Sequence, residues 1–317
     1  MISVKDWNES DYLDCNPDVR MAIEKGVISS GWEHYQMFGR TEGRCWGQSR
    51  SEKILSEINK KGKGLEIGPS HRPVAPKRKG YNVKILDHMD AEGLREKYRG
   101  HNVDLNAIED VDFVWRGEPI SETVKGEKFD WIIASHVIEH TPDLIGFLNE
   151  CEKILNEDGV LSLVVPDKRY CFDFYREVTS LSCVINAQGR SLHSEGHIAD
   201  YFLNVVRRGG RIAWEAGCRE RFEFVHGLQD AVSNIEAQKR GEYIDVHAWC
   251  FVPSSFRLIV EDLFQLQLIK LRERRFFDTV GHEFFVSLTK DGDGPGISRM
   301  ELQKRKLKEV FASGVPL

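Results

Sequence analysis

The stretch LEIGPSHRP, residues 65–73, joins a short apolar run containing Glu66 to a break at Gly68, Pro69 and Ser70. Residues 82–87, NVKILD, form a second apolar run that ends in Asp87. Continuous apolar runs of this length are typical of strands that a parallel sheet buries on both faces. In a doubly wound sheet, ligands bind beyond the carboxyl ends of the strands. We therefore expect Glu66 and Asp87 at a ligand-binding edge.

From residue 51 onward, apolar strands alternate with helical segments, which are expected at residues 51–62, 90–98 and 141–157. A later helix is expected to begin near Pro253 or Ser254. This alternation predicts an α/β fold with a Rossmann-like, doubly wound, mostly parallel sheet of seven strands. The expected strands are GLEIG (64–68), NVKILD (82–87), VDFVW (111–115), FDWIIAS (129–135), GVLSLVVP (159–166), a sixth at the end of residues 247–271, and HEFFVSLTK (282–290).

Composition and charge limit the class of protein. The chain has 317 residues, of which 41% are hydrophobic and 30% charged, enough for one sizeable core and a small second unit. A formal charge of -6 gives no general attraction to nucleic acid or anionic membranes. The start lacks the pattern of a secretory signal, and no apolar run approaches the length of a membrane span. We expect a cytoplasmic protein that binds no nucleic acid and has no membrane span.

The seven cysteines are odd in number, scattered, and never spaced as a CxxC pair. This distribution indicates reduced thiols, most of them buried, rather than a disulfide framework.

Residues 1–48 are expected to form a small helical module. Its predicted core is Tyr12, Leu13, Val19, Trp32, Tyr35 and Phe38. So small a unit rarely buries enough apolar surface to be independent, so we expect it to pack on the main domain or on a protein partner. Residues 11–44 also resemble a short repeat found beside bacterial glycan-processing domains.

The loop at Gly68 lacks the GxGxxG pattern of dinucleotide-binding proteins, so a pyrophosphate ligand is poorly supported. One acid in the first strand and another at the end of the second suit a ligand with an ammonium group and a ribose. S-adenosylmethionine carries both, and Asp87 is spaced to accept hydrogen bonds from the ribose hydroxyls. The alternative is that either acid simply caps a helix.

Residues 129–170, FDWIIASHVIEHTPDLIGFLNECEKILNEDGVLSLVVPDKRY, resemble the fourth strand, following helix and fifth strand of class I S-adenosylmethionine-dependent methyltransferases. The runs ASHVIEHTPD (134–143) and VVPDKRYCFD (164–173) look like a bacterial subgroup associated with surface-glycan synthesis. The resemblance covers roughly residues 50–290. It implies S-adenosylmethionine as the cofactor. The implied cofactor-binding residues are Glu66, Gly68, Pro69 and Ser70 in the first loop, Asp87 and His88 at the ribose, Trp115 and Gly117 after the third strand, and Ser135 and His136 at the methionine end.

An insertion, residues 171–245, separates the fifth strand from the last pair and is expected to cover the pocket. Residues 197–214 within it read as helical, and its many arginines suit a carboxylate or phosphate on the acceptor. A solvated charged face is the alternative. Residues 293–317 are expected to be a helical tail on the surface, or in contact with a partner or a second subunit.

Methyl transfer to a hydroxyl requires in-line positioning and removal of a proton, for which histidine is the natural base near neutral pH. The candidates are His136 after the fourth strand, His197 in the insertion and His247 before the following helix. Each of the three is also open to a purely structural interpretation. If none is the base, a carboxylate such as Asp167, or simple positioning of a nucleophilic amine, must replace it.

His193 and His197 have the i, i+4 spacing of a helical metal site, but Gly196 disfavours a regular helix and no HExxH glutamate is in register. We therefore expect no metal site there. The sequence favours an O-methyltransferase acting on a sugar or saccharide-derived acceptor in glycan biosynthesis. The alternatives are N- or carboxyl-methylation of a small metabolite, and a non-catalytic cofactor-binding scaffold.

Overall fold

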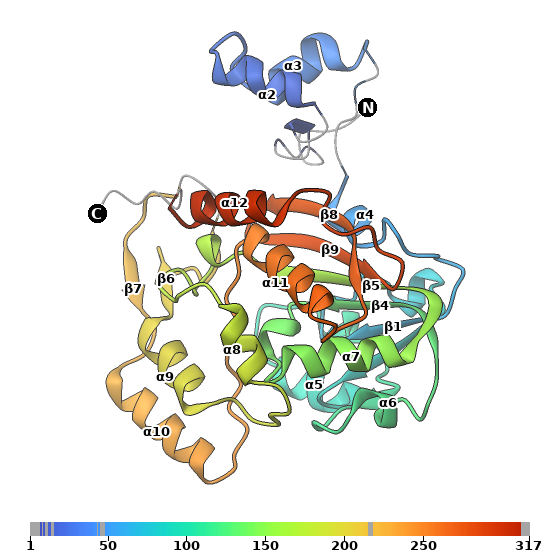
Figure 1. Ribbon diagram of the computed structural model, residues 1–317, viewed down its shortest axis with the longest axis vertical. Coiled ribbons are helices and arrows are strands. Elements are labelled where there is room, and N and C mark those ends of the chain that lie inside the picture. Colours follow the sequence, from blue (N-terminus) through green and yellow to red (C-terminus); the bar gives the residue numbers. More distant parts are fainter. Residues whose placement is uncertain are drawn as a thin grey trace. The chain divides into compact units, whose positions relative to one another are not determined.

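The structure is a computed structural model that describes residues 7, 9, 12–13, 16–42, 44, 48–214 and 218–311 (Figure 1). The chain divides into two compact units, Met1–Ser56 and Glu57–Leu317. Each unit is described by itself.

The second unit is built on a seven-stranded sheet in the order β3-β2-β1-β4-β5-β9-β8. Strands β1 to β5 pair in parallel, whereas β9 runs antiparallel to both β5 and β8. The predicted Rossmann-like, mostly parallel sheet of seven strands is confirmed. The strands are β1 Gly64–Ile67, β2 Val83–Asp87, β3 Phe113–Val114, β4 Phe129–Ser135, β5 Leu155–Pro166, β8 Arg272–Val280 and β9 Glu283–Thr289.

The centre of the sheet is apolar because its strands are covered on both faces. All four residues of β1 are buried, and all seven of β9. Gly64 lies under the ring of Trp131 on β4, and a Cβ at this position would overlap the ring. Only glycine allows this close approach.

Helices cover the sheet. Helix α7, Leu144–Ile154, is capped at its N-terminus by Asp143, whose side chain accepts a hydrogen bond from the backbone N–H of Gly146. Figure 1 shows α7 and α11, Pro253–Gln265, on the same face of the sheet. The smaller helices of this part are α5 Ala91–Lys97 and α6 Ile120–Thr123.

The helix expected near Pro253 is confirmed, but three other boundaries are wrong. The helix predicted over residues 141–157 ends at Ile154, because β5 already begins at Leu155. The helix predicted over residues 51–62 ends at Ile54 (α4, Arg50–Ile54), and Asn59 makes a turn by accepting hydrogen bonds from the N–H groups of Lys61 and Gly62. The sixth strand begins at Arg272 because residues before it complete the end of α11, where Gln267 adopts a left-handed conformation with φ 59°.

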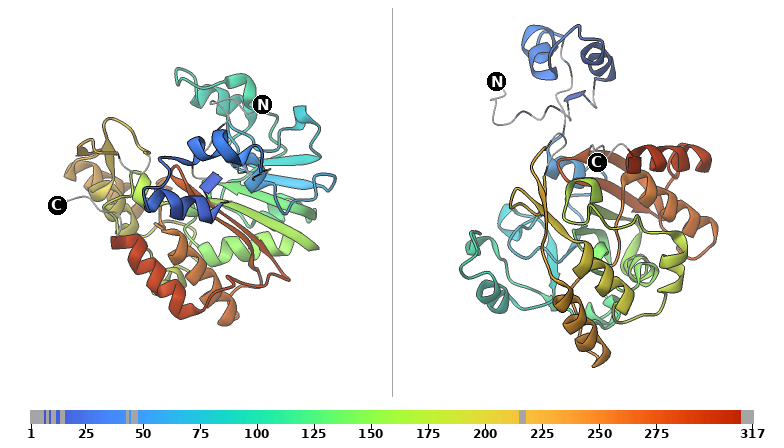
Figure 2. Two further views of the ribbon diagram at one scale, coloured as in Figure 1. Left: turned by 90° about the horizontal axis from the view of Figure 1, so that it is seen from above. Right: turned by 90° about the vertical axis from the view of Figure 1, so that its left-hand side faces the viewer.

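The insertion contains α8 Leu181–Asn186, α9 Glu195–Asn204 and α10 Leu228–Lys239, and a two-stranded sheet of β6 Val206–Arg208 and β7 Phe222–Phe224. Figure 2 shows α9 and α10 side by side. The helix predicted over residues 197–214 is wrong beyond Asn204. Val205 is extended, and the buried Val206 starts a strand paired with Phe224.

The tail helix α12, Arg299–Phe311, packs on α11. Arg299 donates two hydrogen bonds to the carboxylate of Asp262, and Ser254 donates from its N–H and its hydroxyl to Glu309. These contacts join both ends of the two helices. Residues 312–317 of the predicted tail lie outside the described part of the chain.

The first unit is small and aromatic, with α2 Pro17–Glu24, α3 Gly31–His34 and a π-helical turn at Tyr35–Gly39. Tyr12, Val19 and Tyr35 form its core, and Leu13 and Trp32 pack against them. Phe38, also predicted in the core, is 43% exposed because the turn directs it outward.

Of the seven cysteines, five lie in the described part of the chain, all as free thiols. Cys151, Cys171 and Cys250 are buried, as predicted, whereas Cys183 is exposed and Cys218 half-buried. Cys15 and Cys45 fall outside the described residues. No helix in the described ranges is long and apolar enough to cross a membrane.

Candidate active site

The loop after β1 is folded by the acid that precedes it. The carboxylate of Glu66, 1% exposed, accepts hydrogen bonds from the N–H groups of Val74, at 2.6 Å, and Ala75, at 3.1 Å. The expected role of Glu66 at the cofactor's ammonium group is thus accompanied by a structural one. Its charge holds the loop against the end of the strand.

Gly68 and Ser70 make the turn with left-handed backbones, at φ 64° and 50°. A Cβ on Gly68 would lie 3.1 Å from a methyl carbon of Val137, so a side chain there would meet both backbone strain and crowding. The hydroxyl of Ser70 is buried and has no hydrogen-bond partner among the described residues. Pro69 stands between them.

Asp87 at the end of β2 meets this loop directly. Its carboxylate is 2% exposed and accepts hydrogen bonds from the N–H of Ser70, at 3.0 Å, and of His88, at 2.8 Å. The ring Nδ1 of His88 is 2.6 Å from the same carboxylate. The structure therefore brings together the loop and the acid that the sequence placed at one edge.

Trp115 and Gly117 follow β3 at the same edge. The backbone N–H of Trp115 donates a hydrogen bond to the backbone carbonyl of Asp87, at 2.8 Å. Its indole N–H donates one to the backbone carbonyl of Glu118, at 2.6 Å. Gly117 has φ 101°, a conformation that favours glycine. The two residues form a turn adjacent to the end of β2.

His136 comes immediately after Ser135, the last residue of β4, and is held in a left-handed conformation with φ 54°. Its N–H donates to the oxygen of Val164, and its ring Nε2 lies 2.7 Å from a carboxylate oxygen of Glu283. Non-glycine residues in this conformation are uncommon and often mark functional positions. The contact with Glu283 leaves ring Nδ1 for another partner.

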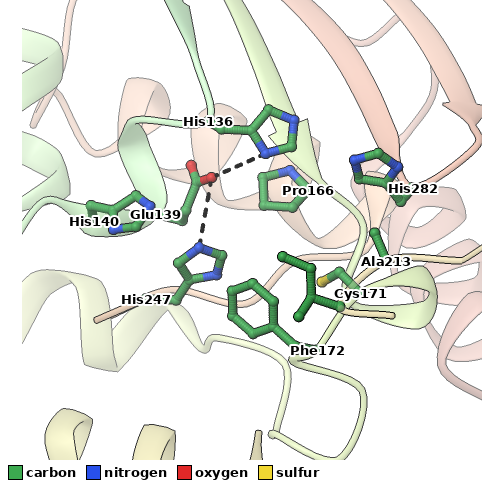
Figure 3. A pocket seen from close by; sticks show the side chains of 10 residues that line it. His136, Glu139, His140, Pro166, Cys171, Phe172, Ala213, His247 and His282 are labelled. Carbon is green, nitrogen blue, oxygen red and sulfur yellow. Dashed lines mark ion pairs between the residues drawn. The ribbon is translucent and has the colours of Figure 1, made fainter. Parts of the chain in front are cut away.

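A pocket lies beyond the ends of β4 and β5 (Figure 3). Two of the three predicted bases, His136 and His247, line it together, and Pro166 marks its side at the end of β5. The other lining residues are Glu139, His140, Cys171, Phe172, Ile212, Ala213 and His282.

The third candidate base, His197, is not among the lining residues. It lies in the first turn of α9, with its ring 5.0 Å from that of Trp249, and burial lowers its pKa. His193 precedes this helix, so the two histidines do not share one helical face. Asp167, the alternative base, is fully buried and bound by Arg169 and Thr279.

His247 is fixed by a buried acid. Its Nδ1 is 2.5 Å from Asp173, which also accepts a hydrogen bond from Arg176 at 2.7 Å. Burial opposes ionisation of Asp173, but the charges and hydrogen bonds of His247 and Arg176 hold its pKa well below the usual range. His140 is held similarly, with Nδ1 2.8 Å from Asp245, and this hydrogen bond lowers the pKa of Asp245 to about 2.

Glu139 is completely buried among these histidines. Neither oxygen of its carboxylate accepts a hydrogen bond from any residue that the structure describes. Two histidine nitrogens lie near it, His136 Nδ1 at 3.5 Å and His247 Nε2 at 4.0 Å (Figure 3). A buried carboxylate without close partners is costly, which marks Glu139 as a functional candidate.

Sequence reasoning missed the pocket residues Glu139, His140 and His282, and the acids that contact its histidines, Asp173, Asp245 and Glu283. The pair Glu139–His140 lies inside the run ASHVIEHTPD and His282–Glu283 inside HEFFVSLTK, so the signal was present as adjacent histidine and acid. Three arginines of the insertion are paired with acids: Arg176 with Asp173 and Asp200, Arg207 with Glu223, and Arg211 with Glu220.

A family profile described as a methyltransferase domain matches residues 43–207, just over half of the chain. The chain belongs to this methyltransferase family. The expected enzyme class is therefore confirmed, and S-adenosylmethionine is the cofactor of this methyltransferase.

Solved structures similar to this methyltransferase include the CcbJ methyltransferase from Streptomyces caelestis. That likeness has 10% identity and a TM-score of 0.40, and covers 74% of this chain and 86% of the other. An S-adenosylmethionine-dependent methyltransferase from Aquifex aeolicus has 14% identity and a TM-score of 0.34, covering 75% and 88%. The glycopeptide N-methyltransferase MtfA, complexed with sinefungin, has 11% identity and a TM-score of 0.37, covering 76% and 92%. No curated protein matches the chain.

Proposed function

We propose that this methyltransferase methylates a hydroxyl group of a sugar or saccharide-derived acceptor. The observation that carries the proposal is His136, a histidine in a strained conformation at the end of β4 whose ring is oriented by Glu283 and which lines a pocket. The resemblance of residues 11–44 and of two runs near β4 and β5 to glycan-associated proteins supports the acceptor class.

The residues at the ends of β1 and β2 fit S-adenosylmethionine. Asp87 offers a buried carboxylate for the ribose hydroxyls, and the unpartnered hydroxyl of Ser70 lies beside it. Gly68 keeps the turn free of a side chain. When bound, the cofactor supplies an electrophilic methyl group on a sulfonium.

His136 is the proposed base. Because its Nε2 is bound to Glu283, Nδ1 is the nitrogen left to accept the proton of the acceptor hydroxyl. The acceptor oxygen forms a bond to the methyl carbon as the carbon–sulfur bond breaks. The bonding electron pair passes to sulfur, and the hydroxyl proton passes to His136.

An acceptor panel tests this function. The full chain is incubated with S-adenosylmethionine and matched sets of neutral sugars, amino sugars and uronic acids, and S-adenosylhomocysteine release is measured. We expect release with neutral hydroxylated sugars, and mass spectrometry of the product should place the methyl group on oxygen. Methylation confined to amines or carboxylates would overturn O-methylation. Cofactor binding without release over the panel would favour a scaffold.

A further inference from the structure

Three groups in the pocket are arranged as ligands for a metal ion. Glu139, His140 and His247 each offer one ligand atom, and these atoms lie within 4.8 Å of one another. Glu139 and His140 come from the turn Ile138–His140 directly after β4, and His247 comes from the segment before α11. Two imidazoles and one carboxylate are a donor set common to zinc and non-haem iron sites.

The unsatisfied carboxylate of Glu139 is an independent observation. It is 0% exposed, and both of its oxygens lack a hydrogen bond from the described part of the protein. If a protonated histidine were its permanent partner, a hydrogen bond of about 2.7 to 2.9 Å would be expected. The observed separations, 3.5 Å to His136 and 4.0 Å to His247, are longer. They leave room for an ion between the groups.

The outer partners of both histidines support the same interpretation. His140 Nδ1 lies 2.8 Å from Asp245, and His247 Nδ1 lies 2.5 Å from Asp173. Metal-binding histidines almost always direct their second ring nitrogen to a carboxylate, a carbonyl or water, which fixes the tautomer that coordinates. With Nδ1 so engaged, Nε2 of each ring carries the lone pair for a metal.

We propose that Glu139, His140 and His247 bind a divalent transition-metal ion, of the zinc or ferrous class. The remaining coordination positions face the pocket, so the ion would bind the acceptor hydroxyl and lower its pKa before His136 takes the proton. This catalytic role rests on the proposed function, whereas the binding of metal does not.

Metal binding is tested on the full chain after dialysis against a chelator. Zinc, ferrous iron under anaerobic conditions, and cobalt as a spectroscopic probe are titrated separately, followed by calorimetry and, for cobalt, visible absorption. We expect one ion per chain and a cobalt spectrum typical of nitrogen and oxygen ligands. Absence of saturable binding of all three ions would overturn the site.

The variant Glu139→Gln separates binding from folding. It removes the buried charge, so the metal-free variant should unfold at the same temperature as the metal-free parent or higher, yet its metal affinity should fall by more than about a hundredfold. Glu157→Gln, at an acid whose side chain is 87% exposed, is the matched control and should bind normally. Equal metal affinity of the Glu139 variant and the parent would overturn the assignment.

Asp245→Asn tests the outer partner of His140. Metal affinity should fall by about tenfold to a hundredfold. Unchanged affinity would contradict the tautomer argument. Failure of the acceptor panel together with intact metal binding would reject the sugar acceptor and leave the metal site standing. Activity that persists in the metal-free enzyme would reject its catalytic role.

Discussion

The two halves of the carboxyl edge differ in how their acids are satisfied. At the ends of β1 and β2, Glu66 and Asp87 accept hydrogen bonds from backbone N–H groups within ten and seventeen residues along the chain. At the ends of β4 and β5, the carboxylate of Glu139 has no such donor in the described ranges and lies near His136 and His247. The acids on the proposed cofactor side are satisfied by their own loop, whereas the carboxylate on the proposed acceptor side is not. The metal ion proposed above would complete it.

The largest expected effect is on the acceptor side. His136→Asn removes the proposed base but keeps a residue that tolerates a left-handed backbone. Turnover should fall by about a hundredfold to ten-thousandfold, and cofactor affinity, to which His136 is also assigned, should fall far less. The residual rate should rise at high pH as the acceptor ionises. Steady-state rates from pH 6 to 10 and calorimetry measure both. Near-normal turnover would show that His136 is not the base. His101→Asn, at an exposed histidine outside the pocket, serves as the control.

The buried histidine His193 should make the stability of the fold depend on pH. Burial lowers the pKa of His193 to about 4, below the value of 6.5 for an unperturbed histidine. The unfolded chain therefore binds more protons between pH 6.5 and 4. The neutral His193 therefore contributes fully to the free energy of unfolding above pH 6.5. As the pH falls to 4, the free energy of unfolding should decrease by about 3 kcal/mol through this residue.

Denaturant unfolding of the parent and of His193→Phe at pH 7.5 and 4.5 measures this contribution. The difference in unfolding free energy between the two pH values should shrink in the variant. An identical pH dependence in both proteins would show that His193 does not remain neutral in the folded state.

On the cofactor side the effect should be smaller. Asp87→Ala should weaken S-adenosylmethionine binding by about 1 to 3 kcal/mol, because ribose hydroxyls would be left unpaired in a buried site. Because the change also removes the partner of Ser70 and His88, thermal unfolding is recorded alongside calorimetry. Normal affinity in a folded variant would remove Asp87 from the binding site.

The smallest effect is expected from the first unit. A chain lacking residues 1–48 should keep its cofactor affinity within about twofold, because every residue assigned to the cofactor lies in the unit Glu57–Leu317. Calorimetry on the shortened chain is the measurement. A folded protein that no longer binds cofactor would contradict this division.

The difference between the two halves of the carboxyl edge also explains which site residues could be predicted from the sequence. Glu66 and Asp87 lie on adjacent strands that are close in the chain, and Gly68 follows the first of them, so strand patterns alone placed them at one edge. The acceptor side combines residues 136–140, 171–173, 245–247 and 282–283, and no spacing rule joins segments so far apart. His197 illustrates the limit, since its position in the insertion suggested the pocket, whereas its ring packs on Trp249. The helix predicted over residues 197–214 likewise stops before Val205, because the strand that begins at Val206 is buried and paired, and this outweighs the helical spacing of its apolar residues.

The reversed direction of β9 has a consequence for how this site can change in evolution. Residues at the beginning of β9, rather than its end, reach the edge where β4 and β5 finish, and this places His282 and Glu283 in or beside the pocket. The hairpin from β8 has only Gly281 and His282 between Val280 and Glu283, with Gly281 at φ 65°. Since side chains alternate along a strand, inserting a single residue into this hairpin would turn Glu283 to the opposite face of the sheet. The orientation of His136 therefore depends on the length of a turn far from it in the sequence, next to Glu283, which is 147 residues away. Duplication or loss of the Gly281 codon would alter the chemistry while every pocket residue is still encoded.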